Sequence, residues 1–146
     1  MLLGDILRDI METAARVPSQ ILMKIDIEHF ECRAFLGSPE VLSQPQIIPI
    51  IAVVMEWIFT KNIGGGQYGP ICKKEQVREL ARLFLDTGYT PFKVDSFSVS
   101  LNGLPQFSKL DISNFGLEWN CDVVWLSNYV VNNVSSIVNV LGLDSI

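Results

Sequence analysis

The stretch Ile21 to Glu31 reads ILMKIDIEHFE, and it decides the fold expected for this chain. Its first part is short, rich in isoleucine and bounded by turn-forming residues, which predicts a β-strand over residues 21–28. Side chains alternate along a strand, so Lys24, Asp26 and Glu28 are expected to share one face. Carboxylates are buried only at a high cost unless they have partners. The three charges therefore indicate either a strand end that opens into a ligand cleft or an edge strand with one face in water.

Helices and strands alternate around this stretch. Apolar residues at helical spacing predict an amphipathic helix over residues 3–17, which Pro18 ends. The remaining expected elements are short helices over 30–37 and from Ser38-Pro39-Glu40, a clear helix over 74–87, buried strands over 47–58 and 121–126, and extended segments over 89–94 and 97–101. This order predicts an α/β domain with a mostly parallel sheet, whose ligand site lies at the carboxyl ends of the strands.

Length and charge narrow the class of protein. The 146 residues suit a single domain, and the net charge of −5 leaves no basic footprint for general nucleic-acid binding. The mean hydropathy of +0.31 is high for a free-standing domain, so part of the apolar surface is expected to meet a partner. The longest apolar stretch, Ile47 to Phe59, contains Pro49 and Glu56 and is too short to predict a membrane span. The sequence shows no signal peptide and leaves the compartment unknown.

The cysteines and the histidine do not predict a metal site. Cys32, Cys72 and Cys121 lie far apart without a CxxC pair, and His29 is the only histidine, so a structural zinc site is not expected. The odd, sparse cysteine count argues against a disulfide scaffold. One glycosylation sequon, Asn133-Val134-Ser135, is present, but such a tripeptide often arises by chance.

The segment LMKIDIEHFE resembles the motif of FkbM-type methyltransferases, which typically read LKIDVEGxE at the fourth strand of their sheet. Further pieces follow in the family's order: SPEVL after the motif, the strand IAVVMEW, a helix that ends at Gly88, and the closing strand DVVWL. The resemblance covers about Leu3 to Leu126 and leaves residues 127–146 as an uncertain tail. It implies a single incomplete domain over 1–146: a partial Rossmann-like methyltransferase fold with strands equivalent to 4-5-7-6 and its first half missing.

The family uses S-adenosylmethionine to methylate mostly hydroxyl oxygens of sugars and other small or glycan-like acceptors. By position, the resemblance makes Asp26 the acid near the methyl-transfer centre and Glu28 its companion, and either carboxylate can accept the hydroxyl proton. Glu31 is expected to hold the turn or face the acceptor. Glu56 either orients the acceptor or pairs with a lysine or backbone amide. His29 replaces the family's glycine and is either a base at the acceptor or a structural turn residue.

The cofactor side of such a fold is not found in this sequence. Nothing before Leu22 matches the glycine-rich loop that binds the cofactor, so no cofactor-binding residue is assigned. The cluster Gly64-Gly65-Gly66 lacks the strand–loop–helix context and is expected to form a surface loop or a lid. Asp26 and Glu28 are oxygen ligands of the kind that divalent ions prefer, but two acids are too few to predict a metal.

Without the first three strands, the edge of the KIDIE strand is expected to be open. Pairing through that edge predicts a homodimer or the docking of a missing amino-terminal half. The chain is therefore interpreted as the carboxyl-terminal half of an O-methyltransferase for sugar or small-molecule hydroxyls, inactive when isolated. The alternative is a non-catalytic methyltransferase relic that acts as a binding or assembly protein.

Overall fold

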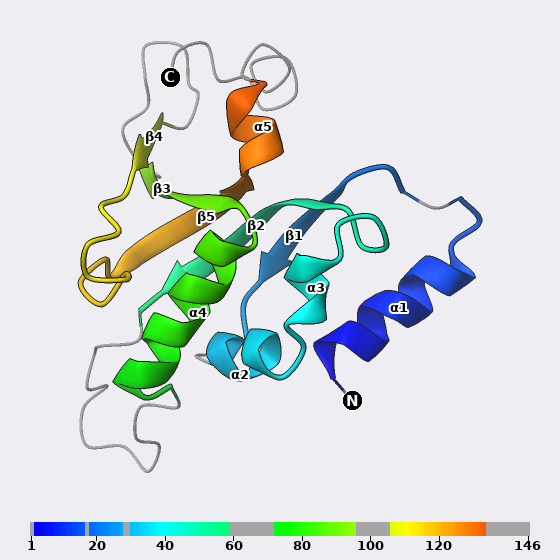
Figure 1. Cartoon of the computed structure of the whole chain (residues 1–146), viewed down its shortest axis with the longest axis horizontal. Coiled ribbons are helices and arrows are strands. Elements are labelled where there is room, and N and C mark those ends of the chain that lie inside the picture. The colour runs from blue at the N-terminus through cyan, green and yellow to red at the C-terminus, as the bar shows by residue number, and fades with distance from the viewer. Residues whose placement is uncertain (1, 17, 28–29, 59–71, 96–105, 134–146) are drawn as a thin grey trace.

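The structure is a computed structural model that describes the chain except residues 1, 17, 28–29, 59–71, 96–105 and 134–146. The described residues form one five-stranded sheet in the order β1-β2-β5-β3-β4, with helices packed against it (Figure 1). The strands are β1 (Ile21–Ile25), β2 (Ile50–Trp57), β3 (Tyr89–Asp95), β4 (Gln106–Lys109) and β5 (Cys121–Ser127). The helices are α1 (Leu3–Thr13), α2 (Glu31–Leu36), α3 (Glu40–Ser43), α4 (Lys74–Asp86) and α5 (Asn128–Asn132).

The prediction of an α/β fold is confirmed, but the prediction of a mostly parallel sheet is wrong. Only β1 and β2 are paired in parallel, whereas β5 is antiparallel to both β2 and β3, and β4 is antiparallel to β3. The reason lies in the connections. Parallel neighbours need a crossover, usually helical, and α2 and α3 supply one between β1 and β2. In the described part of the chain between β3 and β5 there is a strand, β4, and no helix, so β5 returns antiparallel.

One face of the sheet carries the main hydrophobic core. Figure 1 shows α2, α3 and α4 on this side. Side chains that alternate along β2 and β5, such as Val53, Met55 and Trp125, pack there against α2 and α4. The Phe84 ring of α4 stacks on Trp125 at a centroid distance of 4.5 Å. This layer is the one that the apolar face of α4 predicts.

The opposite face carries a smaller cluster, formed by Ala52, Phe92, Val124 and Leu126. Among the described elements, α5 contacts β5 and β3 on this part of the sheet. The cluster ends before β1, where Leu22 is 61% exposed. Part of the high mean hydropathy of the chain therefore comes from apolar side chains that are exposed at the outer strand β1.

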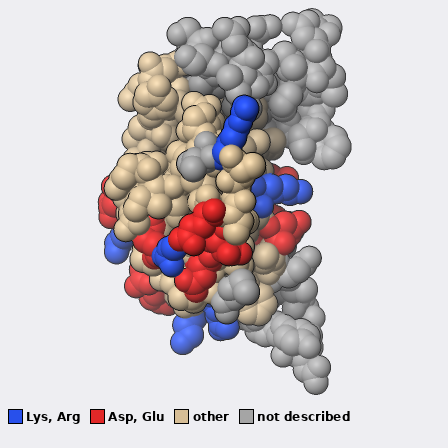
Figure 2. Space-filling view, turned by 90° about the vertical axis from the view of Figure 1, so that its right-hand side faces the viewer, with Lys and Arg blue, Asp and Glu red and all other residues tan. Residues whose placement is uncertain are grey.

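Helix α1 lies beside α3 and is attached by few contacts. The Gly4 N–H donates a hydrogen bond of 3.0 Å to the buried hydroxyl of Ser38. Leu3 and Leu7 pack against the core, whereas the side chains of Ile6 and Ile10 are exposed. Figure 2 views the molecule from the side on which α1 lies, where acidic and basic side chains gather below a largely uncharged surface.

Several element boundaries differ from the expectation. The first strand ends at Ile25, and the first helix ends at Thr13 rather than at residue 17. Strand β4 and helix α5 were not predicted, because neither carries a clear periodic pattern in the sequence. The segments expected over 97–101 and 64–66 lie outside the described residues. Within the described ranges, no helix is both long enough and apolar enough to cross a membrane.

A glycine closes the loop before β5 onto the aromatic core. Gly116 has a φ of +75°, and a Cβ at this position would lie 2.8 Å from Nε1 of Trp57. The indole N–H of Trp57 donates a hydrogen bond of 2.8 Å to the Gly116 carbonyl. Only glycine combines this left-handed backbone with so close an approach.

Tyr89 ties the start of β3 to the start of β2 and makes the fold sensitive to alkaline pH. Its buried hydroxyl donates a hydrogen bond of 2.7 Å to the Ile50 carbonyl, and burial raises the pKa of Tyr89 to about 12 from an ordinary 10.0. Above pH 10.0 the tyrosine of the unfolded chain loses its phenolic proton, whereas the buried tyrosine of the folded chain keeps it until about pH 12. The free energy of unfolding should therefore fall as the pH rises from 10.0 to about 12.

Tyr89→Phe should cost about 1 kcal/mol at neutral pH, since a buried carbonyl loses its donor. It should also remove the Tyr89-specific loss of stability at alkaline pH. Denaturant titrations of both proteins over this range check the prediction. Parallel pH profiles of wild type and variant would contradict it.

Candidate functional site

Three carboxylates lie at the same end of three successive strands of the sheet. Asp26 follows β1, Glu56 is the last residue but one of β2, and Asp122 is the second residue of β5. The register pairs Glu56 directly with Asp122, and the pairing of Ile25 with Met55 brings Asp26 level with Glu56. The antiparallel direction of β5 is the reason that its first residues lie beside the carboxyl ends of β1 and β2.

Glu56 and Asp122 share one face of the sheet, and both are exposed. Alternation along β2 puts Glu56 on the face of Ala52 and Val54, away from the buried Trp57. No ion pair between described residues joins either carboxylate to a cation, so the expected alternative of a lysine pair for Glu56 is not seen there. Asp122 was not among the site residues expected from the sequence. Its signal is present, as the one charged residue in the apolar run CDVVWL.

Glu31 closes the turn after β1. Its side chain is only 2% exposed, and its Oε1 accepts a hydrogen bond of 3.1 Å from the Ile27 N–H. The carbonyl of Ile27 in turn accepts from the Phe30 N–H at 3.2 Å. The geometry matches the expectation that Glu31 holds the turn behind Asp26.

The second carboxylate oxygen of Glu31 is also buried, but it has no hydrogen-bond partner among the described residues. A buried oxygen without a donor is costly, so such an atom in a native fold requires a reason. Glu28 and His29 lie outside the described residues, and their contribution to this turn is not described. Within the described residues, one carboxylate oxygen of Glu31 is thus hydrogen-bonded and the other is buried without a partner.

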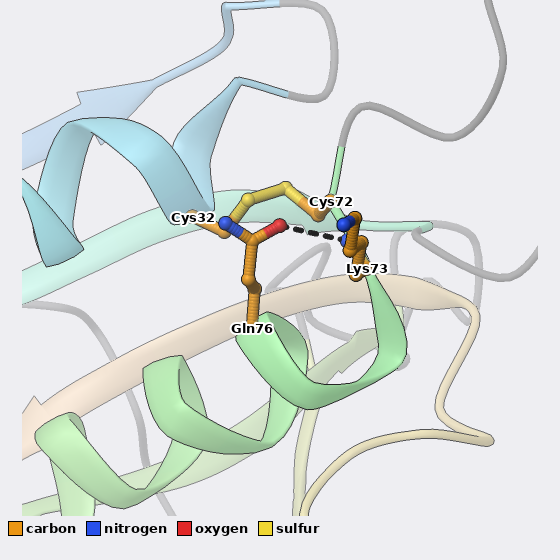
Figure 3. The surroundings of a disulfide bond; sticks show 4 residues. All are labelled: Cys32, Cys72, Lys73 and Gln76. Carbon is orange, nitrogen blue, oxygen red and sulfur yellow. Dashed lines mark hydrogen bonds between the residues drawn. A yellow bond between two sulfur atoms is a disulfide. The ribbon is translucent and has the colours of Figure 1, made fainter.

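A disulfide braces the same turn from the helical side. Cys32 in the first turn of α2 is bonded to Cys72, which precedes α4, with their Cα atoms 6.1 Å apart (Figure 3). The backbone N–H of Lys73 donates to the side-chain oxygen of Gln76 at 2.9 Å and so begins α4 beside the disulfide. The argument against disulfides from the cysteine count is wrong for this pair, because the fold brings together residues that are 40 apart in sequence.

The disulfide should stabilise the fold substantially. Closing a loop of this length in the unfolded chain corresponds to about 4 kcal/mol in the chain-entropy model. Both cysteines are buried, and Cys32 directly follows Glu31. The turn that carries the motif is therefore held at two adjacent residues, by a hydrogen bond and by a covalent bond.

The arrangement suits proton acceptance and hydrogen bonding better than metal binding. In the described part of the chain, no group of three or more His, Cys, Asp and Glu side chains is placed to hold a metal ion. Exposed carboxylates at a strand end can accept hydrogen bonds from hydroxyl groups and can accept their protons. We call the group formed by Asp26, Glu56 and Asp122 the acidic edge. The name refers to the end of the sheet at which these residues lie and not to an outer strand.

Like charges that face each other across a strand pair destabilise a sheet, so the acidic edge should reduce the stability of the fold. Glu56→Gln or Asp122→Asn should each raise the free energy of unfolding by about 0.2–1 kcal/mol. The double variant should gain little more than either single variant, because the repulsion is lost only once. Urea denaturation of the four proteins measures the coupling, which should shrink in high salt. A coupling energy of zero would contradict this reading of the edge.

Comparison with known proteins adds no relative to this picture. A scan against protein-family models, a search of curated proteins and a search of solved structures each found no match. The chemistry proposed for the acidic edge is therefore argued from its own residues and not from a relative.

Proposed function

We propose that this chain is the acceptor-side half of an S-adenosylmethionine-dependent O-methyltransferase of the FkbM type, acting on hydroxyl groups of sugars or other small molecules. Asp26 is the residue placed at the reacting hydroxyl. Glu56 and Asp122 orient the acceptor, and Glu31 positions the turn. These roles go beyond the shared α/β architecture, and each can be tested separately.

The strand order is the observation that carries the proposal. Strand β5 comes last in the chain but lies between β2 and β3, which gives the order β1-β2-β5-β3. The family resemblance independently implies that the motif strand and its successors lie in the order 4-5-7-6, which is the same arrangement. A short KIDIE motif does not by itself require a later strand to insert at this place. The agreement therefore supports the resemblance over most of the chain.

The chemistry of the acidic edge is compatible with this reaction. Methyl transfer to a hydroxyl needs an in-line approach and a group that accepts the hydroxyl proton. S-adenosylmethionine, when bound, supplies a methyl group on a positively charged sulfonium. A row of carboxylates is a suitable environment for a cation, and the exposed Asp26 carboxylate is available as the proton acceptor.

The side chains at the edge also indicate the acceptor class. Hydroxyl-rich molecules are bound through several hydrogen bonds, and ionised carboxylates accept such bonds strongly. Glu56 and Asp122 are paired across β2 and β5, so their carboxylates offer two hydrogen-bond acceptors side by side. This pattern favours a polyhydroxylated acceptor over an apolar one.

The remaining half of the domain would attach at β1. Among the described strands, β1 has a neighbour only on the β2 side, and an unpaired strand edge recruits further strands. Two exposed apolar side chains accompany it, Leu22 on β1 and Ile27 in the turn that follows. We name this surface the β1 edge and propose that it receives the cofactor-binding half, or a second copy of the chain when that half is not present.

The test of function uses the native gene product, including any sequence that precedes residue 1 in its transcript. Its intact mass is measured first. The protein is then assayed for transfer of a labelled methyl group from S-adenosylmethionine to a panel of glycans. Asp26→Asn should lower kcat by about 100-fold or more, because a proton acceptor is lost. Asp86→Asn is the matched control, since Asp86 ends α4 at the opposite end of the sheet and is also exposed.

Two results would overturn the proposal. One is a native product of 16.4 kDa that binds no S-adenosylmethionine in calorimetry, which would favour the non-catalytic relic. The other is a methyltransferase in which Asp26→Asn and Asp86→Asn have the same full activity.

Association through the β1 edge can be measured separately. The isolated chain should form dimers or larger species in light scattering, and Leu22→Asp should shift it toward monomer by placing a charge in the apolar surface. Tyr129→Asp is the control, because Tyr129 is 69% exposed on α5, away from β1. A stable monomer of the wild-type chain, or an equal effect of both substitutions, would contradict the assignment of this surface.

A further inference from the structure

Asn133 is an exposed side chain at the end of α5, and it begins the tripeptide Asn133-Val134-Ser135. This tripeptide meets the acceptor rule for N-linked glycosylation, because the middle residue is not proline. A sequon alone is weak evidence. Its surroundings and the redox state of the cysteines provide two further observations that bear on it.

The side-chain amide of Asn133 is accessible in the fold. Its Nδ2 donates one hydrogen bond of 2.7 Å to the Tyr129 carbonyl. An amide nitrogen carries two hydrogens, and a glycosylated amide keeps one, so the modified side chain can still make this bond. The neighbouring side chains of Tyr129 and Asn132 are exposed as well. Val134 and Ser135 lie outside the described residues, so accessibility is argued from Asn133 and its described neighbours alone.

The Cys32–Cys72 disulfide gives the independent observation. Disulfides of this kind persist in oxidising compartments and are rare where thiol reductants are abundant. Cys32 is fully buried and Cys72 nearly so, which shields the bond from reductants. The oxidising secretory compartments of eukaryotic cells are also where N-linked glycans are added. Both features thus indicate the same environment.

Asn133 lies at the other end of the sheet from the acidic edge. Helix α5 follows the carboxyl end of β5, and because β5 is antiparallel this end lies at the edge of the sheet opposite Asp26, Glu56 and Asp122. Figure 1 shows α5 at the top of the molecule and α2, next to the acidic edge, at the bottom. A glycan on Asn133 would therefore be attached at the end of the sheet opposite the acidic edge.

We propose that Asn133 carries an N-linked glycan and that the chain matures in an oxidising secretory compartment. The donor class is a lipid-linked oligosaccharide pyrophosphate. The bond between the anomeric carbon and the pyrophosphate oxygen breaks, and a bond from that carbon to Nδ2 of Asn133 forms. The amide loses one proton, and the lipid pyrophosphate leaves. No oxidant or reductant takes part in this step, and it does not depend on the proposed methyl transfer.

The experiment uses the native protein from its source, treated with peptide N-glycosidase in heavy-oxygen water. Asn133 should be converted to an oxygen-labelled aspartate, with faster gel migration after treatment. Ser135→Ala should abolish the modification, while Ser135→Thr, which preserves the sequon, should retain it. Asn132→Gln is the adjacent control and should leave the modification unchanged, provided that Asn133 is the acceptor.

Mass spectrometry of the same sample, alkylated without reduction, reports the cysteines. The proposal expects Cys32 and Cys72 to be protected from alkylation and joined in one cross-linked peptide. An unmodified Asn133 peptide from the native protein would overturn the glycosylation, whatever the state of the cysteines. Alkylated Cys32 and Cys72 would overturn the oxidising compartment.

Discussion

The insertion of β5 between β2 and β3 is the constraint on which the rest of this structure depends. β5 pairs along its length with both neighbours, and the side chains of Val123, Val124, Trp125 and Leu126 are buried on both of its faces. Trp125 contributes to the aromatic core under α4, whereas Val124 and Leu126 form the cluster on the other face. Removing this strand would separate the parallel pair β1–β2 from the antiparallel pair β3–β4.

The same insertion arranges the two ends of the molecule. Because β5 runs against β2, its first residues bring Asp122 to the acidic edge, and its last residues lead into α5 at the opposite edge. One strand direction thus places a like-charged row where the resemblance expects an acceptor and places the sequon far from it. The acidic edge is exposed and is expected to reduce stability through like-charge repulsion, so packing does not explain it.

The sequence predicted the elements that have a strong pattern. The strands β2 and β5 carry apolar residues on both faces, and α4 has an apolar face at helical spacing, so their positions could be found from residue types alone. The direction of β5 could not, since it depends on how the chain connects β3 to β5. The facing of Glu56 and Asp122 depends on register, which no local pattern in either strand specifies.

The disulfide and the burial of the Glu31 side chain could not be predicted from the sequence, for a related reason. Cysteine spacing does not show which residues α2 and α4 bring together, and the pair is 40 residues apart. The prediction that Glu31 holds a turn came from the resemblance, whereas its burial, and the lack of a partner for one of its oxygens among the described residues, depend on tertiary packing around the turn. Asp26 was expected at the end of its strand and lies there, but Asp122, which the register pairs with Glu56, comes from a segment nearly a hundred residues further along than Asp26.

The strand that carries the motif is also the least supported strand of the sheet. β1 has five residues and one paired neighbour, whereas β2 is longer and paired on both sides. Asp26 therefore depends for its position on the turn that links β1 to α2, which the Glu31 hydrogen bond and the Cys32–Cys72 disulfide hold on the helical side. On the other side, no described residue fixes it. A strand added to the β1 edge would complete that support, since it would pair the backbone next to Asp26 and cover Leu22. If the β1 edge receives a partner and Asp26 accepts the proton, as proposed, assembly and catalysis would be coupled through β1, because the proposed docking surface and the proposed proton acceptor belong to the same short segment.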